Sequence, residues 1–271
     1  MRQIILALLM IASMAVPAQA AEMKVHNQSV HYTVQGSGHT IIFVHGWTCD
    51  ETSWSRQVPA FVGKYRVITL DLPGHGKSDA PAQHDFSMNS FAETVEAVRA
   101  TTGADRVVLV GHSMGAVVIR QYALNYPDHV AGLVAADGPL DIRLLAAPTV
   151  NQPPMTLEAR QQLIESMFVP ETSKSLRIRI RKMMLNTSEA TAIGASGSMF
   201  DPANRSDQII RAPALTIYAG KALFPRDEKT KEMLPNWEAS EIEGTGHFVM
   251  MEKPETFNRL LAAFLSNRAR Y

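Results

Sequence analysis

Short apolar runs alternate with amphipathic stretches over most of the chain. Runs of about four to eight β-branched and apolar residues predict buried strands, whereas apolar positions that recur about every three to four residues predict helices. We expect strands, in chain order, at 30–34, 40–44, 66–70, 106–110, 130–136, 214–218 and 237–242. Helices are expected at 54–62, 87–99, 116–126 and 254–265. The alternation of strands and helices predicts an α/β fold with a mainly parallel sheet that helices cover on both faces. The run at 30–34, followed by a glycine-containing turn at 35–38 and the run at 40–44, predicts an opening hairpin.

The alternation stops between Gly138 and Ser206. This segment is rich in methionine, proline and polar residues, and helical patterns recur only at 157–168 and 175–185. We interpret it as a helical lid, 138–206, inserted between two parts of one core domain, 21–137 and 207–271.

The first twenty residues have the pattern of a secretory signal peptide. Arg2 precedes an uncharged apolar run at 4–16, which Pro17 and the small residues Ala18-Gln19-Ala20-Ala21 follow. The run is too short to cross a bilayer, which needs about 20 apolar residues. We therefore expect cleavage after Ala20, a periplasmic or secreted product, and no stable membrane span.

Charge and cysteine content narrow the possible functions. The chain of 271 residues has 26 basic and 26 acidic residues, so it lacks the positive patch typical of nucleic-acid binding, and its ligand is expected to be a small molecule that is not polyanionic. Cys49 is its single cysteine, which excludes an intramolecular disulfide and a cysteine-rich zinc site. No cluster has metal-ligand spacing, so we expect no metal and no cofactor.

A serine stands in a sharp turn between a predicted strand and a predicted helix. The apolar run that ends at Val110 leads directly into Gly111-His112-Ser113-Met114-Gly115, and a helical pattern follows. This is a G-x-S-x-G nucleophile elbow in the strand–turn–helix context that the motif requires. Ser113 is therefore the candidate nucleophile.

Four motifs together resemble the α/β-hydrolase superfamily, in particular its serine carboxylesterases with a helical lid. The elbow is one of them. The others are His45-Gly46-Trp47, the turn Asp71-Leu72-Pro73-Gly74-His75-Gly76-Lys77-Ser78-Asp79, and Gly244-Thr245-Gly246-His247-Phe248 followed by Glu252-Lys253-Pro254-Glu255. The resemblance implies an oxyanion hole formed by the backbone N–H groups of Trp47 and Met114.

A serine hydroxyl needs an imidazole base, and the base needs an acceptor on its other ring nitrogen. His247 is the candidate base, because it lies in a glycine-bounded loop between the last strand and the last helix, after the serine in the chain. Of the other histidines, His45 and His75 are expected to stabilise their loops, and the backbone of the elbow is expected to hold His112. The remaining five are expected to lie at the surface or to be paired within the fold.

The position of the acid departs from the family pattern. Relatives usually carry an aspartate three residues after the glycine that corresponds to Gly220, where this chain has Leu223. Two aspartates remain as candidates: Asp137 at the end of the strand after the elbow, and Asp227 further along the loop. We prefer Asp137, because neighbouring parallel strands bring their carboxyl ends to one edge of the sheet.

The sequence thus predicts an exported serine hydrolase that cleaves a small carboxylic ester. A lactonase, a thioesterase or a cofactor-free haloperoxidase-like enzyme would use the same triad. The alternative that is not an enzyme is a hydrolase-like binding protein whose triad has decayed. A dehalogenase or an epoxide hydrolase would need a carboxylate where Ser113 stands. Cys49 is expected to be a buried thiol rather than a nucleophile. Several methionines are candidates for an apolar pocket: Met155, Met167, Met183, Met184, Met199, Met250 and Met251.

Overall fold

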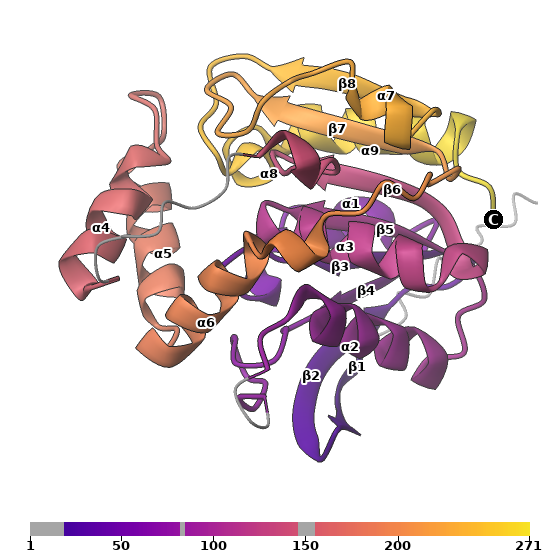
Figure 1. The fold of residues 1–271 in the computed structure, drawn as a ribbon, viewed down its shortest axis with the longest axis horizontal. Coiled ribbons are helices and arrows are strands. Elements are labelled where there is room, and N and C mark those ends of the chain that lie inside the picture. The colour runs from indigo at the N-terminus through magenta and orange to yellow at the C-terminus, as the bar shows by residue number, and fades with distance from the viewer. Residues whose placement is uncertain (1–18, 82–84, 146–154) are drawn as a thin grey trace, which may run out of the picture.

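The computed structural model describes residues 19–81, 85–145 and 155–271. Its centre is an eight-stranded sheet in the order β1-β2-β4-β3-β5-β6-β7-β8 (Figure 1). The strands are β1 (Gln19–Val25), β2 (Gln28–Gln35), β3 (Thr40–Val44), β4 (Arg66–Leu70), β5 (Val107–His112), β6 (Val130–Ala136), β7 (Ala214–Ala219) and β8 (Trp237–Ile242).

The sheet is parallel from β4 to β8, whereas β2 pairs antiparallel with both of its neighbours, β1 and β4. The predicted run at 30–34 lies in β2, which pairs with β1 on one side and with β4 on the other. The expected hairpin of this run with the run at 40–44 is wrong, because β4 lies between β2 and β3 in the sheet. The sequence analysis did not indicate β1, because its exposed and half-exposed residues carry no buried pattern. The other predicted strands are confirmed, as is the α/β fold class.

Helices cover both faces of the sheet (Figure 1). Two of them, α2 and α3, lie on one face, and α1 and α9 lie on the other. The core is formed by fully buried strands such as β3, β5 and β6, together with the apolar faces of these helices. Their bounds are α1 (Val58–Phe61), α2 (Met88–Thr101), α3 (Met114–Asn125) and α9 (Pro254–Asn267).

Three helices between β6 and β7 lie together beyond the carboxyl ends of the strands (Figure 1). The residue before each helix caps it. Its side chain accepts a hydrogen bond from the backbone N–H of the residue three positions later, which satisfies one of the free amides of the first turn. Two were predicted, and the third, α6, was not, because its small residues form no apolar stripe. The helices are α4 (Leu157–Ser166), α5 (Lys174–Leu185) and α6 (Glu189–Met199).

Nearly all of the predicted signal peptide, residues 1–18, lies outside the described residues. Gln19 and Ala20, the last two residues before the predicted cleavage site, are the first residues of β1. None of the helices in the described part of the chain combines the length and the hydropathy needed to cross a membrane.

Candidate active site

Ser113 lies between β5 and α3 in a backbone conformation that residues other than glycine rarely adopt, with φ 52° and ψ −117°. Glycines make this turn possible. A Cβ atom at Gly111 would lie 2.3 Å from the carbonyl oxygen of Gly115, and a Cβ at Gly115 would lie 2.5 Å from that of Val44. The chain stores local strain at Ser113 that the packed strand and helix hold in place. The side chain is thereby presented to a cavity at the carboxyl edge of the sheet.

His247 and Asp137 form a buried pair beside this serine. The Nδ1 atom of His247 lies 2.7 Å from Oδ2 of Asp137, and the two side chains are 2% and 0% exposed. Asp137 is the first residue after β6, and its Oδ1 accepts a hydrogen bond of 3.0 Å from the backbone N–H of Ala219 at the end of β7. Both carboxylate oxygens are therefore engaged, and the pair orients the Nε2 side of the imidazole away from Asp137.

Asp227, the alternative acid, belongs to a local turn instead. Its side chain accepts a hydrogen bond of 2.8 Å from the backbone N–H of Lys229, just before α7 (Thr230–Met233). Leu223, which occupies the usual position of the acid in the family, lines the cavity. The structure thus brings Ser113, His247 and Asp137 to one place and leaves Asp227 outside it.

The predicted oxyanion donors flank the serine. Neither the backbone N–H of Trp47 nor that of Met114 has an acceptor among the residues that the structure describes. The carbonyl oxygen of Gly46 accepts hydrogen bonds from Nδ1 of His45 at 2.8 Å and from the backbone N–H of Cys49 at 3.1 Å. A trans peptide directs its N–H opposite to its carbonyl, so these two bonds fix the direction of the Trp47 N–H.

His45 is itself held at its second nitrogen. Its Nε2 accepts a hydrogen bond of 2.9 Å from the backbone N–H of Leu72, which requires the tautomer with a proton on Nδ1. Burial lowers the pKa of His45 below its usual value, so the ring is neutral, as this arrangement demands. The expectation that His45 stabilises its loop is confirmed.

The expected partner of His112, the backbone of the elbow, is wrong, because its side chain bonds to the loop of His247 instead. Its Nε2 donates a hydrogen bond of 3.0 Å to the carbonyl oxygen of His247, and the two rings are 4.6 Å apart. Burial lowers the pKa of His112 well below its usual value, so the ring stays neutral. The residue before the candidate nucleophile therefore holds the loop of the candidate base, a contact across 135 residues of sequence.

The loop of His247 is also bound to the segment between β6 and β7. The backbone N–H of His247 donates to the carbonyl oxygen of Met167 at 2.9 Å. Glu252 strengthens this junction, because its Oε2 accepts hydrogen bonds from the backbone N–H of Gly246 and from the hydroxyl of Thr172. The residues that follow α4 and the loop of His247 thus form one hydrogen-bonded unit.

The cavity next to Ser113 has a volume of about 300 Å³. Four of the seven candidate methionines line it, namely Met155, Met167, Met184 and Met199, whereas the other three are buried without lining it. Cys49 also lines the cavity, which its sequence position did not indicate. It is buried, and burial raises the pKa of its thiol, which disfavours the thiolate that a nucleophile needs.

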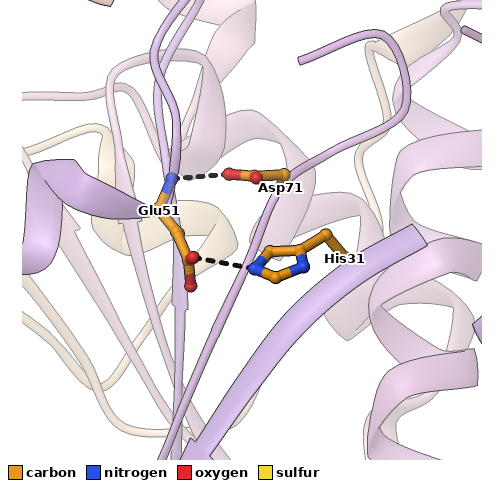
Figure 2. A group of neighbouring side chains, drawn as sticks. All are labelled: His31, Glu51 and Asp71. Atoms are coloured by element: carbon orange, nitrogen blue, oxygen red, sulfur yellow. Dashed lines mark hydrogen bonds and ion pairs between the residues drawn. The ribbon is translucent and has the colours of Figure 1, made fainter. Parts of the chain in front are cut away.

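One group of side chains has the composition of a metal site. His31 on β2, Glu51 in a short 3₁₀ turn and Asp71 after β4 lie together (Figure 2). Their ligand atoms are already paired within the protein: Glu51 Oε1 lies 2.9 Å from His31 Nε2, and the ammonium of Lys77 lies within 3.4 Å of both. The oxygens of Asp71 accept from the backbone N–H groups of Glu51 and Lys77. The cluster therefore braces β2 against two loops.

Comparison with known proteins agrees with this geometry. Residues 39–168 match the alpha/beta hydrolase fold family. A 2-hydroxy-6-oxononadienedioate/2-hydroxy-6-oxononatrienedioate hydrolase of Paraburkholderia phymatum is 30% identical over 263 residues, which cover 87% of this chain and 90% of that protein. The chain belongs to the α/β-hydrolase family.

Other proteins similar to this α/β hydrolase are named for different reactions. An (E)-2-((N-methylformamido)methylene)succinate hydrolase of Acinetobacter baylyi is 27% identical, over 89% of this chain and 95% of that protein. An esterase of Thermogutta terrifontis has a TM-score of 0.79 at 21% identity, over 92% of this chain and 98% of that one, which supports the fold. The family membership identifies the chain as a hydrolase.

Proposed function

We propose that this protein is a serine hydrolase that cleaves a small carboxylic ester through an acyl-enzyme. The observation that carries the proposal is the buried His247–Asp137 pair, joined at 2.7 Å, which lies at the same cavity as the strained Ser113. Serine, carboxylate and imidazole, in this order along the chain, are the components that acyl transfer on this fold requires.

The proposed reaction begins when Ser113 Oγ attacks the ester carbonyl carbon and its proton passes to Nε2 of His247. Asp137 accepts the Nδ1–H of the imidazolium and stabilises its charge. The oxyanion of the tetrahedral intermediate accepts hydrogen bonds from the N–H groups of Trp47 and Met114, and the start of α3 adds the favourable end of a helix dipole. Collapse breaks the ester C–O bond, and His247 returns the proton to the leaving alkoxide.

Water completes the cycle in the second half. His247 takes a proton from water as the water oxygen attacks the acyl carbon, and it then protonates Ser113 Oγ as the carboxylic acid leaves. We assign residues 138–206 the part of a lid, because α4, α5 and α6 contribute Leu163, Met184, Ser196 and Met199 to the cavity wall. They would exclude bulk water and select the acyl group.

A fluorophosphonate probe and a short-chain aryl ester test the proposal together. We expect the wild-type protein to be labelled on Ser113 and to release nitrophenol in a burst, and Ser113→Ala to lose both while it melts at a similar temperature. A wild-type protein that resists the probe would be the hydrolase-like binding protein instead. Turnover of a 2-hydroxy-6-oxo-dienedioate without turnover of any ester, thioester or lactone would assign carbon–carbon bond hydrolysis.

We also propose that the protein is exported and cleaved after Ala20. Cleavage there would shorten β1 by two residues and leave the pairs from Ala21–Tyr32 to Val25–Gln28 in place. Mass spectrometry of protein from the secreting host should give Ala21 as the first residue. An intact N-terminus in a membrane fraction would contradict this expectation.

A further inference from the structure

The wall of the cavity is apolar apart from a few small polar groups. Methionine, leucine, phenylalanine and tryptophan side chains form most of it, and its polar side chains are Ser113, Ser196, His112, His247 and Cys49. Within the described residues, no lysine or arginine lines this cavity. Residues 146–154, which precede Met155 of the wall, read AAPTVNQPP and contain no basic residue.

Basic residues of neighbouring segments are held elsewhere by backbone carbonyls. Arg160 of α4 is buried and donates to the carbonyl oxygens of Met184 and Thr187, at 2.8 and 3.0 Å. The ammonium of Lys221, on the loop after β7, donates to the carbonyl oxygen of Ser166 at 3.0 Å.

Arg177 of α5 is held in the same way. Its Nε donates to the carbonyl oxygen of Thr172 at 2.9 Å, and its guanidinium lies 5.2 Å from the ring centre of Phe168. These cations therefore hold parts of the segment between β6 and β7 in place. None of the three side chains lines the cavity, so none offers a hydrogen-bond donor to a substrate bound there.

We propose that the site accepts acyl groups with a neutral apolar end and rejects those that end in a carboxylate. This inference rests on the proposed serine hydrolase function. A carboxylate that entered the cavity would lose its hydration and gain no cationic partner, which is strongly unfavourable. A neutral chain would instead contact methionine side chains, which adapt to irregular shapes. The volume of about 300 Å³ is at the small end of ligand sites and favours a small acyl group.

The proposed preference for a neutral acyl group would distinguish this protein from two of its relatives. The names of the relatives from Paraburkholderia phymatum and Acinetobacter baylyi specify a dioate and a succinate, which are dicarboxylates. A site that handles such a substrate needs a partner for the second carboxylate, such as an arginine.

Two aryl esters of equal carbon number test the inference directly. 4-Nitrophenyl hexanoate and the mono-4-nitrophenyl ester of hexanedioic acid differ only in the end of the acyl chain, which is a methyl group or a carboxylate. We expect kcat/KM to be at least about 100-fold higher for the hexanoate. The neutral methyl ester of the hexanedioate derivative controls for size and should recover most of the loss.

A cation placed at the mouth of the cavity should reverse the preference. Leu223 lines the cavity and is 41% exposed, so Leu223→Arg adds a charge without burying it. We expect this variant to raise kcat/KM for the charged ester at least about tenfold. Ile178→Arg is the matched control, because Ile178 is 63% exposed and does not line the cavity.

The outcomes distinguish this inference from the proposed function. If both esters are cleaved within about threefold of each other and Ser113→Ala abolishes both reactions, the inference is overturned and the serine hydrolase function stands. If the wild-type protein cleaves neither ester and resists the fluorophosphonate probe, the proposed function itself fails. A folded Leu223→Arg variant that keeps the full discrimination would show that charge is not the cause, which also overturns the inference.

Discussion

The backbone N–H of Ala219 donates to Oδ1 of Asp137 and leaves Oδ2 to His247. This division fixes the orientation of the carboxylate. In an Asp137→Asn variant the amide oxygen would stay opposite Ala219 N–H, and the amide NH₂ would face Nδ1 of His247. The imidazole would then carry its proton on Nε2, the tautomer that cannot accept the proton of Ser113.

We therefore expect Asp137→Asn to lower kcat on the order of 10⁴-fold, the loss known for the equivalent change in a serine protease. Asp227→Asn is the matched control and should cost less than about tenfold, because Asp227 only caps a turn. Steady-state kinetics with an aryl ester measures both, and melting temperatures exclude a folding defect. The opposite ranking would transfer the role of the acid to Asp227.

His45 offers a second test, because its two nitrogens have separate partners. His45→Ala removes the donor to Gly46 O and the acceptor of Leu72 N–H. His45→Asn restores a donor at the position of Nδ1 but not the acceptor. We expect both variants to lose about 1 to 3 kcal/mol of stability, because the Leu72 N–H is left buried and unpaired.

The kinetic effects of these variants should differ. Loss of the Gly46 bond frees the Trp47 peptide, so His45→Ala should lower kcat roughly 100-fold with little change in KM, whereas His45→Asn should keep kcat within about tenfold of wild type. Equal losses of kcat in the two variants would mean that His45 stabilises the loop without orienting the donor.

Acid should destabilise the fold through its buried histidines. Burial lowers the pKa of His75 to about 3, and it also lowers the pKa values of His45 and His112. In the unfolded chain such groups titrate near pH 6.5. Between about pH 6.5 and 3 the unfolded state therefore binds more protons than the folded state, so stability falls as the pH falls and is unaffected by these groups above that range.

Urea unfolding at several pH values checks this expectation. Each such histidine contributes a slope of up to about 1.4 kcal/mol per pH unit. His75→Leu should reduce the slope between pH 6 and pH 4 by about this amount, and the stability at pH 7.5 reports any change in packing. A slope that is the same in the variant and the wild type would show that His75 takes no part in acid unfolding.

The sheet could be predicted from sequence because its central strands are uninterrupted apolar runs. Their burial on both faces leaves a local signature that neither β1 nor α6 has. β1 and α6 were missed for the opposite reason. β1 has no fully buried residue, and α6 combines glycine, serine and alanine, so that much of its stability comes from packing against its surroundings.

The candidate site was predictable where a motif is local. Glycines around Ser113 and His247 mark the turns, and the order of the parallel strands favoured Asp137 over Asp227. The catalytic roles of Ser113 and Asp137 stay predictions, which Ser113→Ala and Asp137→Asn test. The contacts of His112 and Met167 with the loop of His247 were not predictable, because they join residues 135 and 80 positions apart through backbone atoms, which leave no trace in residue identity.

The hydrogen bond from His247 N to Met167 O has a consequence for recombination between family members. Exchange of residues 138–206 for the equivalent segment of a relative would replace the wall of the cavity, and it would also replace the carbonyl that positions the loop of His247. A Cβ atom at Gly246 would lie 2.4 Å from that carbonyl oxygen, so the two backbones must match closely. Chimeras that keep Met167 and Phe168 with the core of this chain should inherit a new specificity and still turn over, whereas whole-segment exchanges should fold and stay inactive.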